Sequence, residues 1–158
     1  MKKLTYLLPG GFRFYGLIFT LAGAMLGTMR FYFGVKPDLL EQKAFAVYSV
    51  YLGTKTLRVV NNQLIDEIAG VLLIAGLFMI AFAREKNENP LLNSIRLKAF
   101  FISIYLNTVF LIFSLLFTFG LAFMYMSIMN LVLPLLLYII SFRILAGIEK
   151  IKNPDLIS

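Results

Sequence analysis

Apolar residues are gathered into four long runs, and the short segments between them are polar and contain most of the Lys and Arg residues. With boundaries good to about three residues, the runs cover residues 12–33, 64–83, 90–119 and 121–146. A helix of roughly 20 mostly apolar residues crosses the hydrocarbon core of a bilayer. The pattern therefore predicts an all-α membrane protein whose four transmembrane helices form an antiparallel bundle in a single integral membrane domain.

The first connection, residues 35–63, is the only long segment outside the spans. It carries aromatic and aliphatic residues, and it resembles neither a disordered tail nor an independent domain. We expect a short outer amphipathic helix here, opened near Pro37 and ended by Gly53, that lies on the membrane surface. Asn61 or Asn62 is then the expected N-cap of the second span.

The other two connections have clear local signals. Residues 84–89 form a polar loop, and its last residue, Asn89, precedes Pro90, whose fixed φ suits a first helical turn. Gly120 is a natural left-handed stop between the third and fourth spans. These two spans are therefore predicted to form a tight antiparallel hairpin.

The distribution of positive charge predicts an orientation. Ten of the 15 Lys and Arg residues fall on the side that holds both termini and the loop 84–89, and the other five lie on the side of the loop 35–63. The positive-inside rule then makes both termini cytoplasmic, and we expect an inner-membrane protein. The basic N-terminus before an apolar run resembles a signal peptide, but we expect it to be retained as the first span.

Composition excludes several classes of function. The chain is 60% hydrophobic with a mean hydropathy of +0.86, more apolar than a soluble fold of this length. It has no Cys and no His, which removes thiolate catalysis, disulfides and the commonest metal ligand and proton carrier. The net charge of +7 lies in clusters beside the spans rather than along one face, so nucleic acid is not an expected partner. We expect no enzyme, no cofactor and no metal site.

Two stripes inside the spans are candidate contact surfaces. Small residues lie on one face of the first span, at Gly16, Thr20, Gly23 and Gly27. They let another helix approach closely, either within the bundle or from a second subunit. Polar residues follow one face of the third span and its counterpart in the fourth, among them Ser103, Asn107, Ser114 and Asn130. Asn107 and Asn130 lie at similar depth and are expected to share a hydrogen bond, directly or through water, unless the stripe lines a polar passage.

Charged residues form two further candidate sites. The outer charge cluster consists of Arg30, Arg58, Asp66 and Glu67, with Arg30 expected to pair with one of the two acids. This cluster is either an ion pair between helix ends or part of an outward ligand pocket. On the cytoplasmic side, Arg84, Glu85, Lys86 and Arg96 are candidates either for contact with anionic headgroups or for docking of another protein.

The segment 61–120 resembles a family of small four-span inner-membrane proteins of Bacteroidota. The resemblance rests on Asn61-Asn62 and Asp66-Glu67-Ile68, on residues 81–88, and on Ile95-Arg96-Leu97 followed by Asn107. This family often has Phe-Ser-Lys-Glu-Lys where the chain has Phe82-Ala83-Arg84-Glu85-Lys86. The resemblance implies a bacterial inner-membrane location and, since some members accompany transcriptional regulators, a signalling role. It supplies no activity, cofactor or site residue.

The sequence favours a non-enzymatic membrane protein that acts through protein contacts, as an accessory subunit or regulator of a larger membrane assembly. Its expected partners are the lipid bilayer and either other membrane subunits or further copies of itself. One alternative is a small transporter or channel for an ion or polar solute, which would use Asn107 and Asn130. Another is a membrane sensor that binds a ligand at the outer charge cluster.

Overall fold

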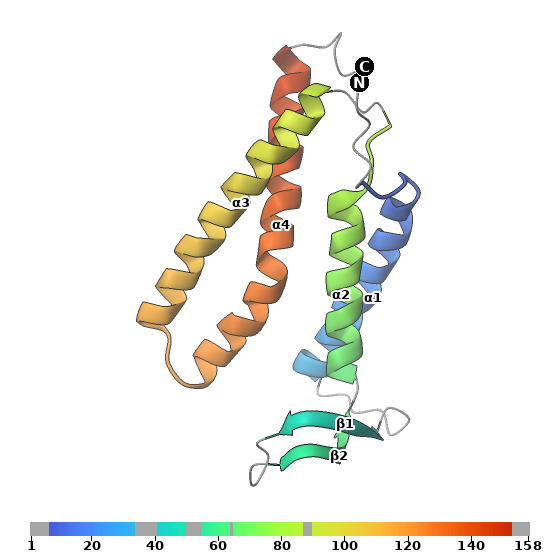
Figure 1. Ribbon diagram of the computed structural model, residues 1–158, viewed down its shortest axis with the longest axis vertical. Helices are drawn as coiled ribbons and strands as arrows, with labels where there is room; N and C mark the ends of the chain where they lie inside the picture. Colours follow the sequence, from blue (N-terminus) through green and yellow to red (C-terminus); the bar gives the residue numbers. More distant parts are fainter. Residues whose placement is uncertain (1–6, 34–40, 50–54, 64, 87–89, 153–158) are drawn as a thin grey trace. The chain divides into compact units, whose positions relative to one another are not determined.

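A computed structural model describes residues 7–33, 41–49, 55–63, 65–86 and 90–152 (Figure 1). Its elements are α1 (Phe12–Phe33), β1 (Glu41–Ser49), β2 (Lys55–Gln63), α2 (Ile65–Phe82), α3 (Pro90–Phe117) and α4 (Leu121–Lys152). Each of the four helices is long and apolar enough to cross a membrane. The predicted four-span membrane fold is therefore confirmed.

The helix ends lie close to the predicted ones. The start and end of α1 agree with the sequence pattern, and α2 and α3 differ from it by one and two residues at their ends. The fourth helix continues to Lys152 instead of ending near residue 146, because residues 147–152 hold no proline and end the helix with Lys150 and Lys152 in its last turn. Cations in this position interact favourably with the helix dipole. Asn89, the expected cap of α3, lies outside the described residues.

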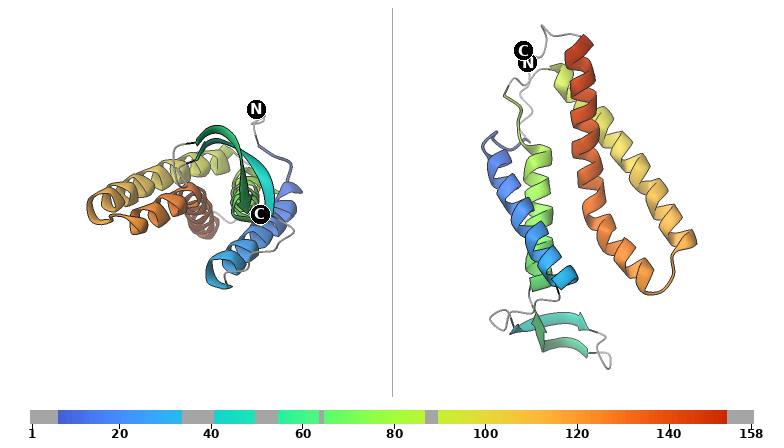
Figure 2. Two further views of the ribbon diagram at one scale, coloured as in Figure 1. Left: turned by 90° about the horizontal axis from the view of Figure 1, so that it is seen from below. Right: turned by 180° about the vertical axis from the view of Figure 1, so that it is seen from behind.

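The chain divides into two compact units, Met1–Phe19 with Ile74–Ser158, and Thr20–Leu73. In the first unit, α3 and α4 lie side by side as the predicted antiparallel hairpin (Figure 2). Gly120 joins them with a φ of 65°, the left-handed conformation that glycine adopts without strain. The predicted stop at Gly120 is confirmed.

The core of the first unit lies near the beginning of α3 and the end of α2. Its buried members are Ala81, Leu92, Ile95, Ala99, Tyr138 and Phe142. Tyr138 and Phe142 stack with an angle of 14° between their rings, and Phe82 and Tyr138 stack with an angle of 16°. Small residues on α2 and α3 thus leave room for the aromatic side chains of α4.

Close approach of α1 and α2 depends on two glycines. A Cβ at Gly16 would lie 2.8 Å from the carbonyl oxygen of Gly76, and a Cβ at Gly23 would lie 2.7 Å from the amide nitrogen of Leu73. Gly27 has no neighbouring atom within 4 Å of such a Cβ. Gly16 and Gly23 therefore serve packing within the chain, one of the two roles predicted for the small-residue face, whereas a side chain at Gly27 would meet open space. Thr20, the remaining member of that face, is half-buried.

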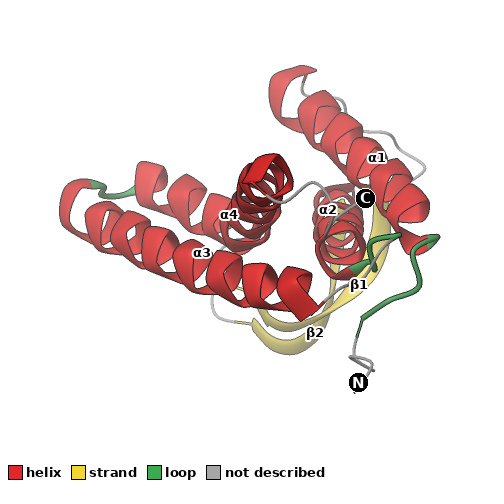
Figure 3. Ribbon diagram, turned by 90° about the horizontal axis from the view of Figure 1, so that it is seen from above, coloured by secondary structure: helices red, strands yellow, loops and turns green. Residues whose placement is uncertain are grey.

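The segment between α1 and α2 is a β-hairpin and not the predicted amphipathic helix (Figure 3). Strands β1 and β2 pair antiparallel from Glu41 with Gln63 to Ser49 with Lys55. Residues 43–47 alternate between large and small side chains, and 56–60 is rich in β-branched residues, both of which favour strands. Pro37 and Gly53, the expected ends of the helix, lie outside the described residues.

The hairpin also changes the start of the second span. Asn61 and Asn62 were expected to cap it, but both pair with β1 inside β2. The helix begins at Ile65, and Asp66 and Glu67 fill its first turn. These two acids are favourable there because the N-terminal end of a helix carries a partial positive charge.

Candidate functional site

Backbone pairing in the first unit joins the segment before α1 to the segment after α2. The amide of Leu8 donates to the carbonyl of Phe82 at 3.0 Å, and the amide of Arg84 donates to the carbonyl of Leu8 at 2.9 Å. This pairing fixes the beginning of α1 beside the end of α2. It brings Arg13, in the first turn of α1, next to Glu85 although 72 residues separate them in sequence.

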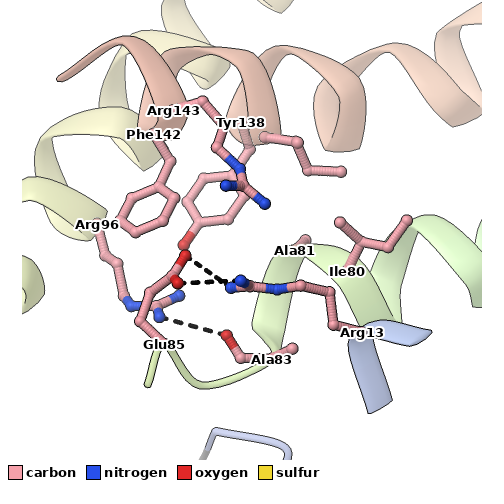
Figure 4. A pocket seen from close by; sticks show the side chains of 10 residues that line it. Arg13, Ile80, Ala81, Ala83, Glu85, Arg96, Tyr138, Phe142 and Arg143 are labelled. Carbon is pink, nitrogen blue, oxygen red and sulfur yellow. Dashed lines mark hydrogen bonds and ion pairs between the residues drawn. The ribbon is translucent and has the colours of Figure 1, made fainter. Parts of the chain in front are cut away.

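Arg13 and Glu85 form a two-pronged ion pair (Figure 4). Nη1 of Arg13 donates to Oε2 of Glu85 at 2.9 Å, and Nη2 lies 2.6 Å from Oε1. Both side chains are mostly covered, with exposed fractions of 32% and 23%. Planar guanidinium and carboxylate groups that meet in this way form the strongest class of side-chain hydrogen bond.

Arg96 lies on the opposite side of the same loop and is buried, with only 8% of its surface exposed. Its Nη2 donates to the carbonyl oxygen of Ala83 at 3.3 Å, and its Cζ lies 4.7 Å from the ring centroid of Phe142. A guanidinium over an aromatic face is attracted by the ring's negative potential. Figure 4 shows Arg96 and Arg13 reaching the loop from different helices, with Arg143 of α4 nearby. We call Arg13, Glu85, Arg96 and Arg143 the Glu85 cluster.

The cluster lowers the pKa of Glu85 below its usual value of 4.5. The largest cause is the hydrogen bond from Arg13, and the positive charges of Arg13, Arg143 and Arg96 act in the same direction, whereas partial burial opposes them. Glu85 is therefore ionised at neutral pH. It serves as the counter-charge of three arginines that come from three helices.

The lowered pKa predicts how stability depends on pH. A carboxyl group with a lower pKa in the folded state stabilises the fold above its unfolded pKa, and this contribution is lost as pH falls through the folded value. At neutral pH we expect Glu85→Gln to unfold more easily than wild type by about 1 kcal/mol. The difference in thermal stability should shrink as pH falls below about 4.5, because the unfolded chain binds its proton there and Glu85 of the folded protein follows at its lower pKa. A difference in thermal stability between wild type and Glu85→Gln that stays constant across this pH range would contradict the stabilising role of the ionised Glu85.

The space enclosed by the Glu85 cluster is too small for a ligand. It measures about 10 Å³ and is lined by the four charged residues together with Ile80, Ala81, Ala83, Tyr138, Ile139 and Phe142. A cavity of this size holds a water molecule at most. The cluster therefore joins chain segments, and it is not itself a binding pocket.

Two larger cavities border the cluster. An apolar cavity of about 420 Å³ lies along Phe78, Phe82, Leu97 and Phe100, with Arg96 and Tyr138 at its margin. The second, of about 320 Å³, is basic. Its lining residues are Glu85, Lys86, Leu92, Phe142, Arg143, Ala146, Gly147 and Lys150. We call this second one the basic cavity.

The predicted cytoplasmic contact residues fall into two groups. Lys86 is exposed and lines the basic cavity, whereas Arg96 is buried and Glu85 is held by Arg13. Arg84 is half-buried, and its backbone pairs with Leu8. Arg96 is therefore not part of an exposed contact surface, because its face of α3 meets the aromatic core.

Sequence reasoning missed the other members of the site. Arg13, Arg143 and Lys150 were counted only as charges on one side of the membrane, and Tyr138 and Phe142 only as apolar or polar positions of a span. The topology could have indicated that these residues lie near one another, because it places the start of the first span and the end of the second at one end of the bundle. It does not specify which charges meet there.

The outer charge cluster is present in part. Nε of Arg30 donates to Oδ1 of Asp66 at 2.9 Å, so the predicted ion pair is confirmed with Asp66 as the acid. The Asp66 side chain is 41% exposed, and surface pairs of this kind contribute little to stability. Glu67 is exposed in the same first turn of α2. Arg58 lies in β2, where its backbone pairs with Ala46, and its side chain lies outside the described part.

The polar residues of α3 and α4 are mostly satisfied within their own helices. Oγ of Ser103 donates to the carbonyl of Phe100 at 2.7 Å, and Oγ1 of Thr118 donates to that of Ser114 at 2.6 Å. The buried Oδ1 atoms of Asn107 and Asn130 accept no hydrogen bond from the described chain, and Oγ of Ser114 also has no partner there. A direct bond between Asn107 and Asn130 is therefore absent, and the predicted bond through water stays a prediction.

Comparison of the chain with protein-family models, curated proteins and solved structures found no match. The resemblance to four-span proteins of Bacteroidota therefore stays a prediction.

Proposed function

We propose that this multi-pass membrane protein acts through protein contacts, as an accessory subunit or regulator of a larger membrane assembly. The observation that supports the proposal is the uneven packing of α3 and α4. The buried residues of α3 are Leu92, Ile95, Arg96, Ala99, Ser103 and Ser114. All but Ser114 lie in the first half of the helix, so the second half leaves its apolar surface available to lipid or to another helix.

The second half of α3 has the properties of a helix-contact surface. Tyr105, Val109 and Leu116 are 68%, 65% and 63% exposed, and their spacing of four and seven residues places them on one face. Membrane helices associate through close packing of such faces, because lipid tails give no hydrophobic driving force of their own. A second membrane protein that covers this face would bury side chains that the chain itself leaves open.

The polar groups of the Glu85 cluster support a structural role rather than a chemical one. Arg13 and Glu85 neutralise each other, and Arg96 is bound to the loop backbone and to Phe142. We further propose that this end faces the cytoplasm of a bacterial cell and that the membrane is the inner one. The excess of Lys and Arg at this end supports that orientation.

Site-directed photo-crosslinking in native membranes tests the contact function. A photoreactive amino acid is placed in turn at each exposed position from Ile104 to Phe117. We expect protein adducts of one defined mass at Tyr105, Val109 and Leu116, and none at positions on the opposite face such as Leu111. Helical periodicity of the adducts is the criterion, because random collisions would label all exposed positions equally. Adducts with lipid alone at every position would contradict the proposal.

A further inference from the structure

The basic cavity has both an excess of positive charge and room for a ligand, whereas the space within the Glu85 cluster is too small for one. Lys86, Arg143 and Lys150 converge on it from the loop after α2 and from α4. Within the described part of the chain none of these three cations forms an ion pair, and the one carboxylate of the lining, Glu85, is held by Arg13. The cavity therefore has an excess of positive charge, because its lining holds three cations and one carboxylate, and that carboxylate is also the ion-pair partner of Arg13.

The size and floor of the cavity restrict what it can hold. Its volume of about 320 Å³ is at the lower end of the range for small-molecule sites. Leu92, Phe142 and Ala146 supply an apolar floor, and Gly147 leaves it open, since a Cβ there would meet no atom within 4 Å. A small anionic group that is attached to an apolar body fits this combination.

We propose that the basic cavity binds the phosphate of an anionic phospholipid headgroup. Phosphate oxygens accept several charge-assisted hydrogen bonds, and Arg143 has the planar guanidinium that binds two of them at once. The cavity lies at the ends of α2 and α4, which are both long and apolar enough to span a membrane. The ends of such spans lie at the polar headgroup region of a bilayer. Basic pockets beside membrane helices recognise anionic lipids in this manner. The site is independent of the proposed contact surface on α3.

A free phosphate offers the same oxygens but no apolar part. The floor formed by Leu92 and Phe142 would remain uncovered by inorganic phosphate, whereas the glycerol and upper acyl carbons of a lipid would cover it. We therefore favour the lipid as the occupant. The experiment separates the two sources by offering them individually and together.

Native mass spectrometry of the delipidated full chain in detergent measures the binding directly. Phosphatidylglycerol is titrated against wild type and four variants, Arg143→Gln, Lys150→Gln, Gly147→Leu and Lys98→Gln. We expect one tight phosphatidylglycerol per wild-type chain. Arg143→Gln and Lys150→Gln should each lower the affinity about tenfold, equivalent to the loss of one charge-assisted contact. Gly147→Leu should lower it by at least as much, because its side chain would occupy the space of the phosphate. Gly147→Leu is decisive because it fills the cavity and removes no charge.

Lys98→Gln is the matched control, since Lys98 is an exposed cation of α3 that does not line the cavity. We expect it to bind as wild type does. Equal weakening by Lys98→Gln and Arg143→Gln would show diffuse attraction to the basic end and overturn the proposal. Normal binding by Gly147→Leu, with a thermal stability equal to wild type, would also overturn it. Displacement of the lipid by an equal concentration of inorganic phosphate would overturn the lipid as the occupant.

Discussion

Gly23→Leu is expected to lower the free energy of unfolding by about 3 kcal/mol. A Cβ at this position would lie 2.7 Å from the amide nitrogen of Leu73 and 2.8 Å from the carbonyl oxygen of Ala69. Both are backbone atoms of α2, so no side chain can rotate to make room. The two helices must separate, and the contacts along them are lost. Unfolding by increasing SDS in mixed micelles, followed by far-UV circular dichroism, measures the loss.

Gly27→Leu is the matched control because it makes the same change one helical turn later. No atom lies within 4 Å of a Cβ at Gly27, and leucine favours a helix more than glycine does. We expect stability equal to or slightly above that of wild type. If Gly27→Leu were as damaging as Gly23→Leu, the small-residue face would contact a second molecule, and the assignment to packing within the chain would be wrong.

The difference between Gly23 and Gly27 shows what the sequence does not predict about the contact between α1 and α2. Both lie on the face that spacing predicts, because four residues make slightly more than one helical turn. Which of them meets α2 depends on where the two helices approach each other and where they diverge, and that is set by contacts along the pair. The pattern predicts a contact face, but it does not predict how far along the helix the contact extends.

Helix positions were the most predictable part of the fold. A bilayer requires long apolar runs with satisfied backbone groups, so the sequence marks each span clearly. The hairpin formed by β1 and β2 was missed because no such requirement acts outside the membrane. Residues such as Phe45 and Val47 suit either a strand or a surface helix, and pairing with β2 decides the outcome.

Charged pairs at the ends of consecutive spans could be predicted from the sequence, whereas pairs that depend on contacts between distant segments could not. Arg30 and Asp66 lie at the ends of consecutive spans, so their pairing followed from connectivity. Arg13 and Glu85 meet only because Leu8 pairs with the chain on both sides of Ala83, a backbone contact with no signature in the sequence. The burial of Arg96 depends likewise on Phe142 of another helix.

Reversing the charge of Glu85 is expected to lower stability more than reversing the charge of its ion-pair partner Arg13. Glu85→Lys leaves Arg13, Arg96 and Arg143 without their shared counter-charge and adds a fourth cation among them. We expect a loss of about 3 kcal/mol in the free energy of unfolding, because the variant removes a counter-charge from partly buried arginines and also places a like charge among them. Arg13→Glu should cost about 1 kcal/mol, because Arg96 and Arg143 remain as counter-charges for both carboxylates.

The experiment measures the free energy of unfolding of these two variants. It compares them with the double variant Arg13→Glu, Glu85→Arg and with the single variant Asp66→Lys. Restoring an opposite pair in the double variant should recover part of the loss caused by Glu85→Lys. Asp66→Lys breaks the exposed pair with Arg30 and is expected to cost less than 1 kcal/mol. Raising the salt concentration should rescue Glu85→Lys the most, since like charges at partly exposed positions are screened. Equal losses for Glu85→Lys and Arg13→Glu would mean that Glu85 pairs with Arg13 alone, and that Arg96 and Arg143 are held in place by packing.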